Sequence, residues 1–305
     1  MKLSNLISKL AIFTILANMA DGAVLRYRAS GDWTKISEAA PGDVTGWGDN
    51  PNNAGVAGIA LPGASDDARI NWGGNTVTVS TSVPDVDRLQ IGVDENGNLD
   101  ILNGGSLSSV RDVLVGNNNS NVTDANLYIR GGGELSVGGI LWSSNSSATG
   151  HITVDSGGLL NVGNHLWLGV TQTSTISIAG TLTQTGGILG LGTNNASTPS
   201  GGSASVTIES GGLLALNNIS ANGTNSIQSG SSIDIVGTGR LTLPGNHESV
   251  LGNYVAANLI TGNGNNGAVT VFFDGSETVV TAIPEPSSAL LLGLAGAFGF
   301  CRRKR

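Results

Sequence analysis

The fold of this chain is decided by two similar stretches, LYIRGGGELSV at 127–137 and ITVDSGGLLNV at 152–162. In each, apolar residues alternate with polar residues, a glycine turn follows, and a second alternating segment begins. This is the pattern of two short, half-buried strands. The turn glycine recurs with spacings of 28, 25, 22, 32 and 27 residues, at Gly105, Gly133, Gly158, Gly180, Gly212 and Gly239. A pattern that repeats at such a period is typical of a solenoid.

Alignment on the turn glycine places the apolar residues in three columns. The strand before the turn contributes Leu99/Ile101, Leu127/Ile129, Ile152/Val154, Ile176/Ile178, Val206/Ile208 and Ile233/Ile235, and the Ile176/Ile178 coil requires a turn one residue shorter. The strand after it contributes Leu107, Leu135/Val137, Leu160/Val162, Leu182, Leu214/Leu216 and Leu241/Leu243. An earlier strand contributes Leu89/Ile91, Val113/Val115, Leu166/Leu168 and Leu189/Leu191. Alternate residues of a strand share a face, so equivalent residues stack from coil to coil.

The sequence therefore predicts an all-β fold, a single-stranded parallel β-helix with three short strands per coil. We expect right-handed winding, because crossovers between parallel strands are right-handed. Paired turn glycines such as Gly157 and Gly158 allow positive φ where the chain bends. The loops after the first strand of each coil vary in length and should emerge on one side, a usual place for binding.

The segments that flank the repeats predict caps. Residues 23–85 lack the coil pattern until NTVTVS at 75–80, and they contain Trp33, Trp47 and Trp72. We interpret them as an N-terminal cap with the first strands, because an open solenoid end must be covered. The repeats occupy 86–281, and further strands at 268–273 and 278–281 complete the stack.

Both ends of the chain have the features of targeting segments. Residues 1–22 predict a signal peptide, with Lys2 and Lys9 beside the apolar core LAIFTILA at 10–17. The other end reads IPEP at 283–286, then an uncharged apolar stretch at 287–300, then CRRKR at 301–305. That stretch predicts a C-terminal apolar helix, shorter than the ~20 residues of a relaxed membrane span. Four closing cations favour retention with the basic end in the cytoplasm, and a simple C-terminal anchor is the alternative.

This tail resembles the PEP-CTERM sorting signal of Gram-negative and related bacteria. The resemblance implies sorting and processing at Pro284, Glu285 and Pro286, and stop-transfer at Arg302, Arg303, Lys304 and Arg305. It implies an exosortase-like membrane protease as partner and transient membrane attachment through 283–305. The freed protein would join the cell surface or an extracellular matrix of exopolysaccharide. Roughly residues 70–280 look like the autotransporter-type passenger repeats associated with PEP-CTERM proteins, in LQIG (89–92), SGGLLNVG (156–163) and LWLG (166–169). This second resemblance implies a fold and no activity.

Charge and cysteine content restrict the partners. Six of the 14 Lys and Arg residues lie in the two terminal segments, together with Asp21 and Glu285, which leaves 8 basic residues against 20 acidic ones, a net charge near −12. An acidic body argues against nucleic acid as a partner. The single cysteine lies in the tail, so the body has no disulfide, thiolate metal site or cysteine nucleophile.

Two tryptophans form the sharpest candidate site. Trp142 and Trp167 are 25 residues apart, the local coil period, and each follows an inward leucine. They should stack outward, with His165 beside Trp167. Exposed aromatic rows bind the apolar faces of sugar rings, so these three residues are a candidate carbohydrate platform. The alternative is a stacking ladder that the long loops shield from solvent.

No catalytic, metal or cofactor site is expected. Arg130, Asp155 and Glu209 share one position of the repeat, but they predict an exposed ion pair. The segment Asp94–Asp100 has oxygen ligands in alternation, yet Gly97 breaks the calcium-loop spacing, and an Asn-Gly turn explains it. We therefore expect a non-enzymatic structural or adhesion-type solenoid at the cell surface or in the matrix, with exopolysaccharide as a possible ligand. A polysaccharide lyase or glycoside hydrolase on the same scaffold is the alternative.

Overall fold

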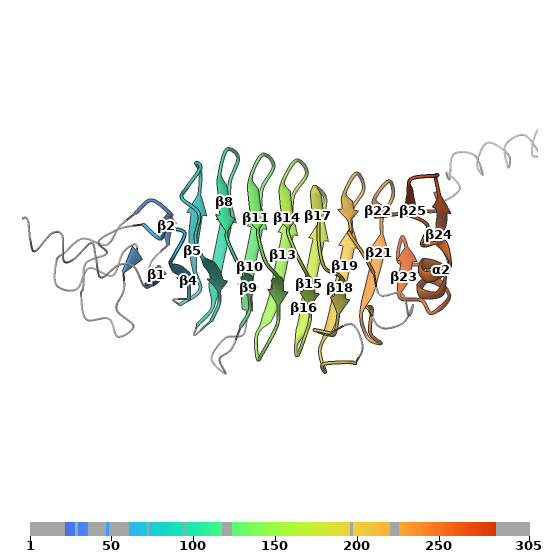
Figure 1. The fold of residues 1–305 in the computed structure, drawn as a ribbon, viewed down its shortest axis with the longest axis horizontal. Helices are drawn as coiled ribbons and strands as arrows, with labels where there is room; N and C mark the ends of the chain where they lie inside the picture. Colours follow the sequence, from blue (N-terminus) through green and yellow to red (C-terminus); the bar gives the residue numbers. More distant parts are fainter. Residues whose placement is uncertain are drawn as a thin grey trace, which may run out of the picture.

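The chain forms a rod of stacked β-coils (Figure 1). This computed structural model describes residues 22–27, 30–35, 47–48, 61–71, 73–93, 95–117, 124–195, 198–219 and 226–284. Three sheets of 8, 9 and 8 strands run along the rod, and successive strands of each coil belong to different sheets. The predicted parallel β-solenoid with three strands per coil is confirmed.

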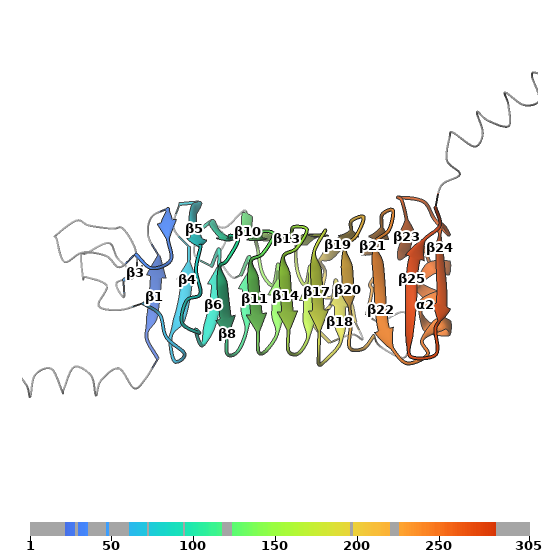
Figure 2. The same cartoon turned by 90° about the horizontal axis from the view of Figure 1, so that it is seen from above.

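Within each sheet, strands of successive coils lie side by side along the rod (Figures 1 and 2). In spatial order, sheet A contains β3 (Trp47–Gly48), β1 (Val24–Tyr27), β4 (Asp67–Ile70), β6 (Arg88–Ile91), β9 (Val113–Val115), β12 (Leu141–Ser143), β15 (Leu166–Leu168) and β18 (Leu189–Leu191). Sheet B contains β2 (Gly31–Asp32), β5 (Asn75–Val79), β7 (Gly97–Ile101), β10 (Asp124–Ile129), β13 (Thr149–Val154), β16 (Thr173–Ile178), β19 (Ser203–Ile208), β21 (Ser232–Ile235) and β23 (Ile260–Gly262). Sheet C contains β8 (Ser106–Ser109), β11 (Glu134–Val137), β14 (Leu159–Val162), β17 (Thr181–Gln184), β20 (Leu213–Ala215), β22 (Arg240–Pro244), β25 (Glu277–Ala282) and β24 (Val269–Phe273).

The core is a set of apolar columns inside the coil. Leu127 pairs in register with Leu99 on one side and with Ile152 on the other, and all three are buried. The same holds for the columns predicted in sheets A and C. Because equivalent side chains stack directly, each coil covers the apolar surface of its neighbours.

The two glycines of each paired turn are required for different reasons, one for its backbone conformation and the other for lack of space. The first of each pair, such as Gly157 or Gly211, has φ near +80° (81° and 85°). The second has ordinary φ but lies against the preceding coil: a Cβ on Gly158 would be 2.7 Å from the Ile129 carbonyl oxygen. The turn that follows Ile178 has a different length. Val154 and Ile178 pair, and so do Leu159 and Thr181, so this turn is two residues shorter and not one as predicted.

The solenoid begins earlier than the sequence pattern indicated. β1 already pairs in parallel with β4, and β2 with β5, so coil pairing starts at Val24 rather than near Asn75. Trp33 and Trp47 are fully buried there, with ring centroids 4.6 Å apart. The Trp47 indole N–H donates to the Trp33 carbonyl at 2.7 Å. The aromatic cap is thus part of the first coils; Trp72 lies outside the described residues.

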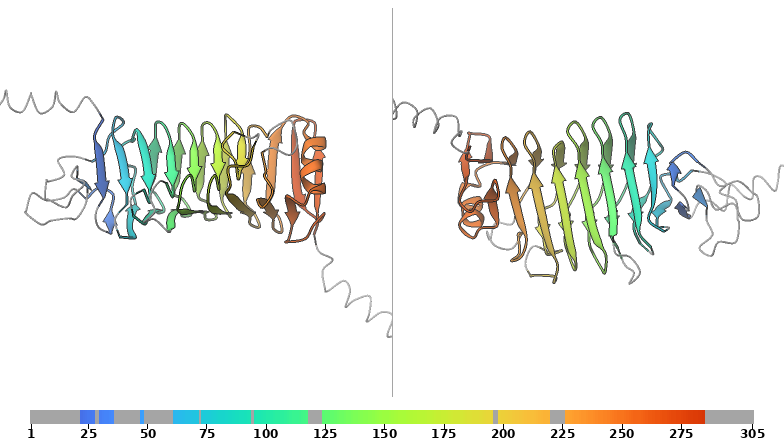
Figure 3. Two further views of the ribbon diagram at one scale, coloured as in Figure 1. Left: turned by 90° about the horizontal axis from the view of Figure 1, so that it is seen from below. Right: turned by 180° about the vertical axis from the view of Figure 1, so that it is seen from behind.

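The C-terminal end also differs from expectation. The predicted strands are present as β24 and β25, but β25 pairs antiparallel with both β22 and β24, so they form a hairpin and not another coil. A helix that was not predicted, α2 (Glu248–Ala256), packs beside them and buries Leu251 and Tyr254 (Figure 3). Its ESVLGNYVA sequence has apolar residues at helical spacing, but it lies inside a β-repeat and includes poor helix formers.

Candidate functional site

Trp142 and Trp167 lie side by side on the outer face of sheet A. The two residues are paired in register between β12 and β15. Their neighbours Leu141 and Leu166 are buried in the core, so both indoles point away from it. The ring centroids are 6.4 Å apart at an interplanar angle of 51°, a tilted arrangement.

The two indoles differ in exposure. Trp167 is only 4% exposed, whereas Trp142 is partly exposed. Trp167 and Val170 are the buried centre of a second apolar cluster, against which Ile140, Trp142 and Ile188 pack. The surface therefore offers one partly accessible indole rather than a row of two, and Trp167 serves to support it.

His165 covers one side of Trp167. The imidazole stacks on the indole with centroids 4.6 Å apart and an interplanar angle of 13°. The Ile188 backbone N–H donates to His165 Nδ1 at 3.1 Å, which fixes the orientation of the ring. His165 thus packs against the tryptophan and holds the next coil, as a positioned part of this apolar cluster.

Gly190 completes the cluster and was not predicted. It pairs in register with Trp167 from β18, and a Cβ there would lie 2.2 Å from Trp167 Cε3. The large indole therefore requires a residue without a side chain on the next coil. The signal was present in the sequence, since the outward position reads Leu114, Trp142, Trp167 and Gly190 in successive coils.

Arg130 lies between two carboxylates on a partly exposed corner of the rod. Its Nε is 2.7 Å from Asp100 Oδ1, and its Nη1 is 3.2 Å from Asp155 Oδ2. The guanidinium also lies 4.6 Å from the centroid of the Tyr128 ring. The hydrogen bonds that Arg130 donates to Asp100, and then to Asp155, raise the pKa of Arg130 above its ordinary value, although partial burial opposes this. The pair with Asp155 was predicted; Asp100, which comes from the coil on the other side, was missed.

The remaining polar candidates are held in structural hydrogen bonds. Asn98 Oδ1 accepts from Asn126 Nδ2 at 2.7 Å, and Asn98 Nδ2 donates to the Gly74 carbonyl at 2.6 Å. Gly97 begins β7 at a corner between sheets A and B, where a Cβ would lie 2.0 Å from the Ile70 carbonyl oxygen. The predicted Asn-Gly turn is thus a coil corner. Among the described residues, no group of three His, Cys, Asp or Glu side chains is arranged to hold a metal ion.

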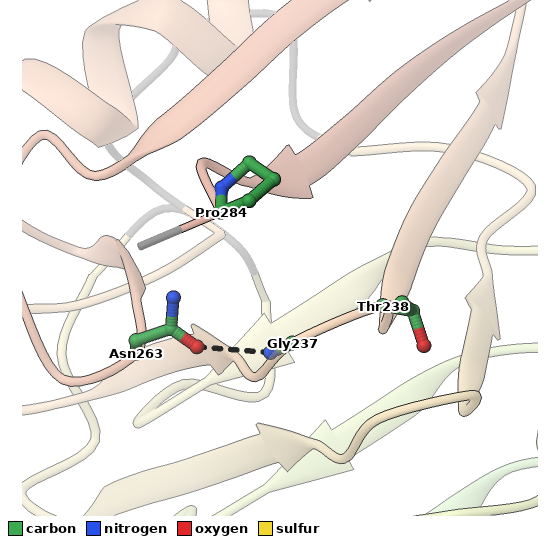
Figure 4. Close-up of a pocket in the computed structure, with 4 residues that line it drawn as sticks. All are labelled: Gly237, Thr238, Asn263 and Pro284. Carbon is green, nitrogen blue, oxygen red and sulfur yellow. Dashed lines mark hydrogen bonds between the residues drawn. The ribbon is translucent and has the colours of Figure 1, made fainter. Parts of the chain in front are cut away.

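The predicted sorting motif begins at the end of the last strand. Ala282 closes β25 and is buried, and Ile283 and Pro284 follow directly at the surface. The Ile283 N–H donates to the Ala268 carbonyl at 2.8 Å. Pro284 borders an open hollow of about 420 Å³ together with Gly237, Thr238 and Asn263 (Figure 4).

Comparison with known proteins identifies this C-terminal segment. The family model of the PEP-CTERM protein-sorting motif matches residues 282–305. No curated protein and no solved structure matches the chain. The molecule is thus a β-solenoid that carries a PEP-CTERM sorting signal. This signal implies export, a membrane-anchored sorting segment, and processing by an exosortase, which is a membrane protein.

Several predicted features lie outside the described residues. They are the signal peptide up to residue 21, Glu285 and Pro286, the apolar stretch 287–300, and the stop-transfer residues Arg302, Arg303, Lys304 and Arg305. In the part of the chain that the structure describes, no helix is long and apolar enough to cross a membrane.

Proposed function

We propose that this protein is a non-enzymatic rod of the cell surface or extracellular matrix, delivered there through its PEP motif. One observation carries the proposal: the sorting signal starts at Ala282, where a solenoid capped at both ends is complete. A stacked solenoid is stiff, because every coil is fixed by both neighbours. Cleavage near the Pro-Glu-Pro would therefore release a finished structural element.

The partly exposed Trp142 supports a role in exopolysaccharide binding. It is held by Trp167 and, through that ring, by His165, so its orientation is fixed before a ligand arrives. Pre-oriented aromatic rings stack on sugar rings at little entropic cost. The outer face of sheet A would then attach the rod to the matrix.

The arrangement of charged groups gives less support to the enzymatic alternative. Two carboxylates and an arginine do converge at Arg130, which is the set that a polysaccharide lyase would need. However, both carboxylates bond to the guanidinium, and the pKa of Arg130 is raised, which opposes its use as a base. Among the described residues, those that line the hollow of about 420 Å³ include no carboxylate.

Mass spectrometry of the protein from the surface fraction of its source cells tests the sorting proposal. We expect a chain that lacks the basic end through Arg305 and ends near Pro284–Pro286. A surface protein that still ends at Arg305 would contradict it. The same preparation, incubated with acidic polysaccharides, should release no unsaturated or reducing ends; their release would establish the enzymatic alternative.

A further inference from the structure

The sorting motif has no linker between it and the fold. The family match begins at Ala282, and this residue is 5% exposed and pairs with Val269 of β24. Only Ile283 separates it from Pro284. Since two extended residues span at most about 7 Å, the Pro-Glu-Pro starts within that distance of the last core residue.

Asn263 links the start of the motif to the body of the rod. It follows β23 with φ of 51°, in the left-handed region. Its Oδ1 accepts from the Gly237 N–H at 2.9 Å, and its Nδ2 donates to the Ile283 carbonyl at 3.4 Å. The Asn263 side chain therefore joins the turn at Gly237, in the preceding coil, to Ile283, where the C-terminal tail begins. Figure 4 shows Asn263 and Gly237 on one side of the hollow and Pro284 across from them.

We infer that the sorting enzyme recognises the last coil together with the motif: the hollow lined by Gly237, Thr238 and Asn263 is a docking surface for the exosortase, and Asn263 positions Pro284 at its edge. This rests on the proposed function. Specific interfaces cover some 20–30 residues on each partner. An enzyme bound to a motif that starts about 7 Å from the core is brought close to the rod. Among the described residues, the surface that borders this hollow beside Pro284 consists of Gly237, Thr238 and Asn263.

The contacts at the edge of the hollow form only in the folded rod. Asn263 and Gly237 meet only when the coils of β21 and β23 have stacked, and Ile283 is held only when β24 and β25 have paired. The docking surface therefore forms at the end of folding at this end of the rod. Processing would select chains whose C-terminal end is complete.

The first test moves the motif away from the rod in the full chain, in source cells with their own sorting system. A flexible ten-residue Gly/Ser linker that ends in a second Ala-Ile pair is inserted after Ile283, so the sequence matched at 282–305 stays intact. Mass spectrometry follows the fraction of chains that lose the tail. We expect slower loss, by about threefold or more. Loss at the wild-type rate or faster would overturn the inference.

Point variants test the surface itself. Asn263→Gly keeps the left-handed backbone and removes both side-chain hydrogen bonds; Asn258→Gly is the matched control, since Asn258 is exposed with φ of 58°. Thr238→Trp places a large ring at the edge of the hollow; Ser156→Trp places the same ring on an exposed turn of a distant coil. We expect both test variants to be processed about threefold more slowly, with both controls at the wild-type rate. Equal rates in tests and controls would reject the docking surface.

Two measurements keep the possible failures apart. Thermal unfolding of each purified variant identifies any loss of fold. If a point variant is unstable, the linker chain still tests whether the exosortase contacts the rod, because the residues of its rod are unchanged. Glu285→Ala removes the central residue of the motif. If wild-type and Glu285→Ala chains keep their tails equally, the proposed function fails. If only Glu285→Ala keeps its tail while the linker chain is processed normally, only this inference fails.

Discussion

At the residue scale, glycine acts in two physically different ways at one turn. Gly211 has φ of 85° and open space where a Cβ would lie. Its neighbour Gly212 has ordinary φ, yet a Cβ there would lie 2.0 Å from the Ile178 carbonyl oxygen of the coil before. One residue permits the bend, and the other permits the close approach of two backbones.

This difference predicts unequal effects of two neighbouring substitutions. Gly211→Ala should lower the free energy of unfolding by about 1 kcal/mol, the cost of a left-handed L-residue. Gly212→Ala should lower it by more, because the opposing group is a backbone carbonyl that moves only if two coils separate. Denaturant unfolding of both variants measures this. An equal or smaller loss in Gly212→Ala would show that the coils relax easily.

Tyr27 predicts a pH dependence of stability. Burial, and then the charge of Asp32, raise the pKa of the phenol from 10.0 to about 12. The folded state therefore favours the neutral phenol, and its contribution is complete below pH 10 and decreases as the pH rises toward 12. Relative to Tyr27→Phe, the wild type should lose about 2 kcal/mol over this window. Denaturant unfolding at several pH values checks it, and parallel curves for the two proteins would refute it.

At the scale of the element, sheet A shows how one repeated position acquires different roles. Its outward position holds Leu114, Trp142, Trp167 and Gly190 on successive strands. The sequence period places these residues in one column. The packing of His165, Val170 and Ile188 then decides that Trp167 is buried while Trp142 is partly exposed.

Substitution of Trp142 should affect ligand binding, whereas substitution of Trp167 should affect the stability of the fold. Trp142→Ala should abolish most exopolysaccharide binding with a small change in unfolding free energy. Trp167→Ala should cost about 3–5 kcal/mol, the usual range for a buried tryptophan. Tyr128→Ala, which removes a partly exposed aromatic from sheet B, is the control. Pull-down with the source exopolysaccharide measures binding. Retained binding in Trp142→Ala, or the same loss in Tyr128→Ala, would exclude the aromatic site.

At the scale of the whole molecule, the rod depends on closed ends. A solenoid end that exposes core and strand edges invites association with other chains. Here the first coils bury Trp33 and Trp47, and the far end is closed by α2 and the β24–β25 hairpin. Leu251 and Tyr254 of α2 are fully buried, and Tyr254 Oη accepts from the Ser226 N–H at 3.1 Å.

Disruption of this cap should change the oligomeric state. Leu251→Asp places a charge in the buried face of α2, so we expect the helix to detach and the exposed end to drive self-association. Asn253→Asp adds the same charge at an exposed position of the same helix and should behave like the wild type. Light scattering after size-exclusion chromatography measures the mass. If Leu251→Asp has the wild-type mass and thermal stability, the helix is not required as a cap.

The solenoid, its three apolar columns and the sorting motif could all be predicted from the sequence, because they depend on local alternation, on a repeated glycine and on a linear signal. It did not reveal where coil pairing begins, since β1 and β2 are too short to show a period, or that α2 and an antiparallel hairpin close the rod. Nor did it reveal the burial of Trp167 or the ion pair of Arg130 with Asp100, because both depend on side chains from neighbouring coils. These features follow from the folded arrangement of the coils, which also places Pro284 at the edge of the hollow lined by Gly237, Thr238 and Asn263. Contacts between coils join residues far apart in the chain, and their geometry follows from packing rather than from any local pattern.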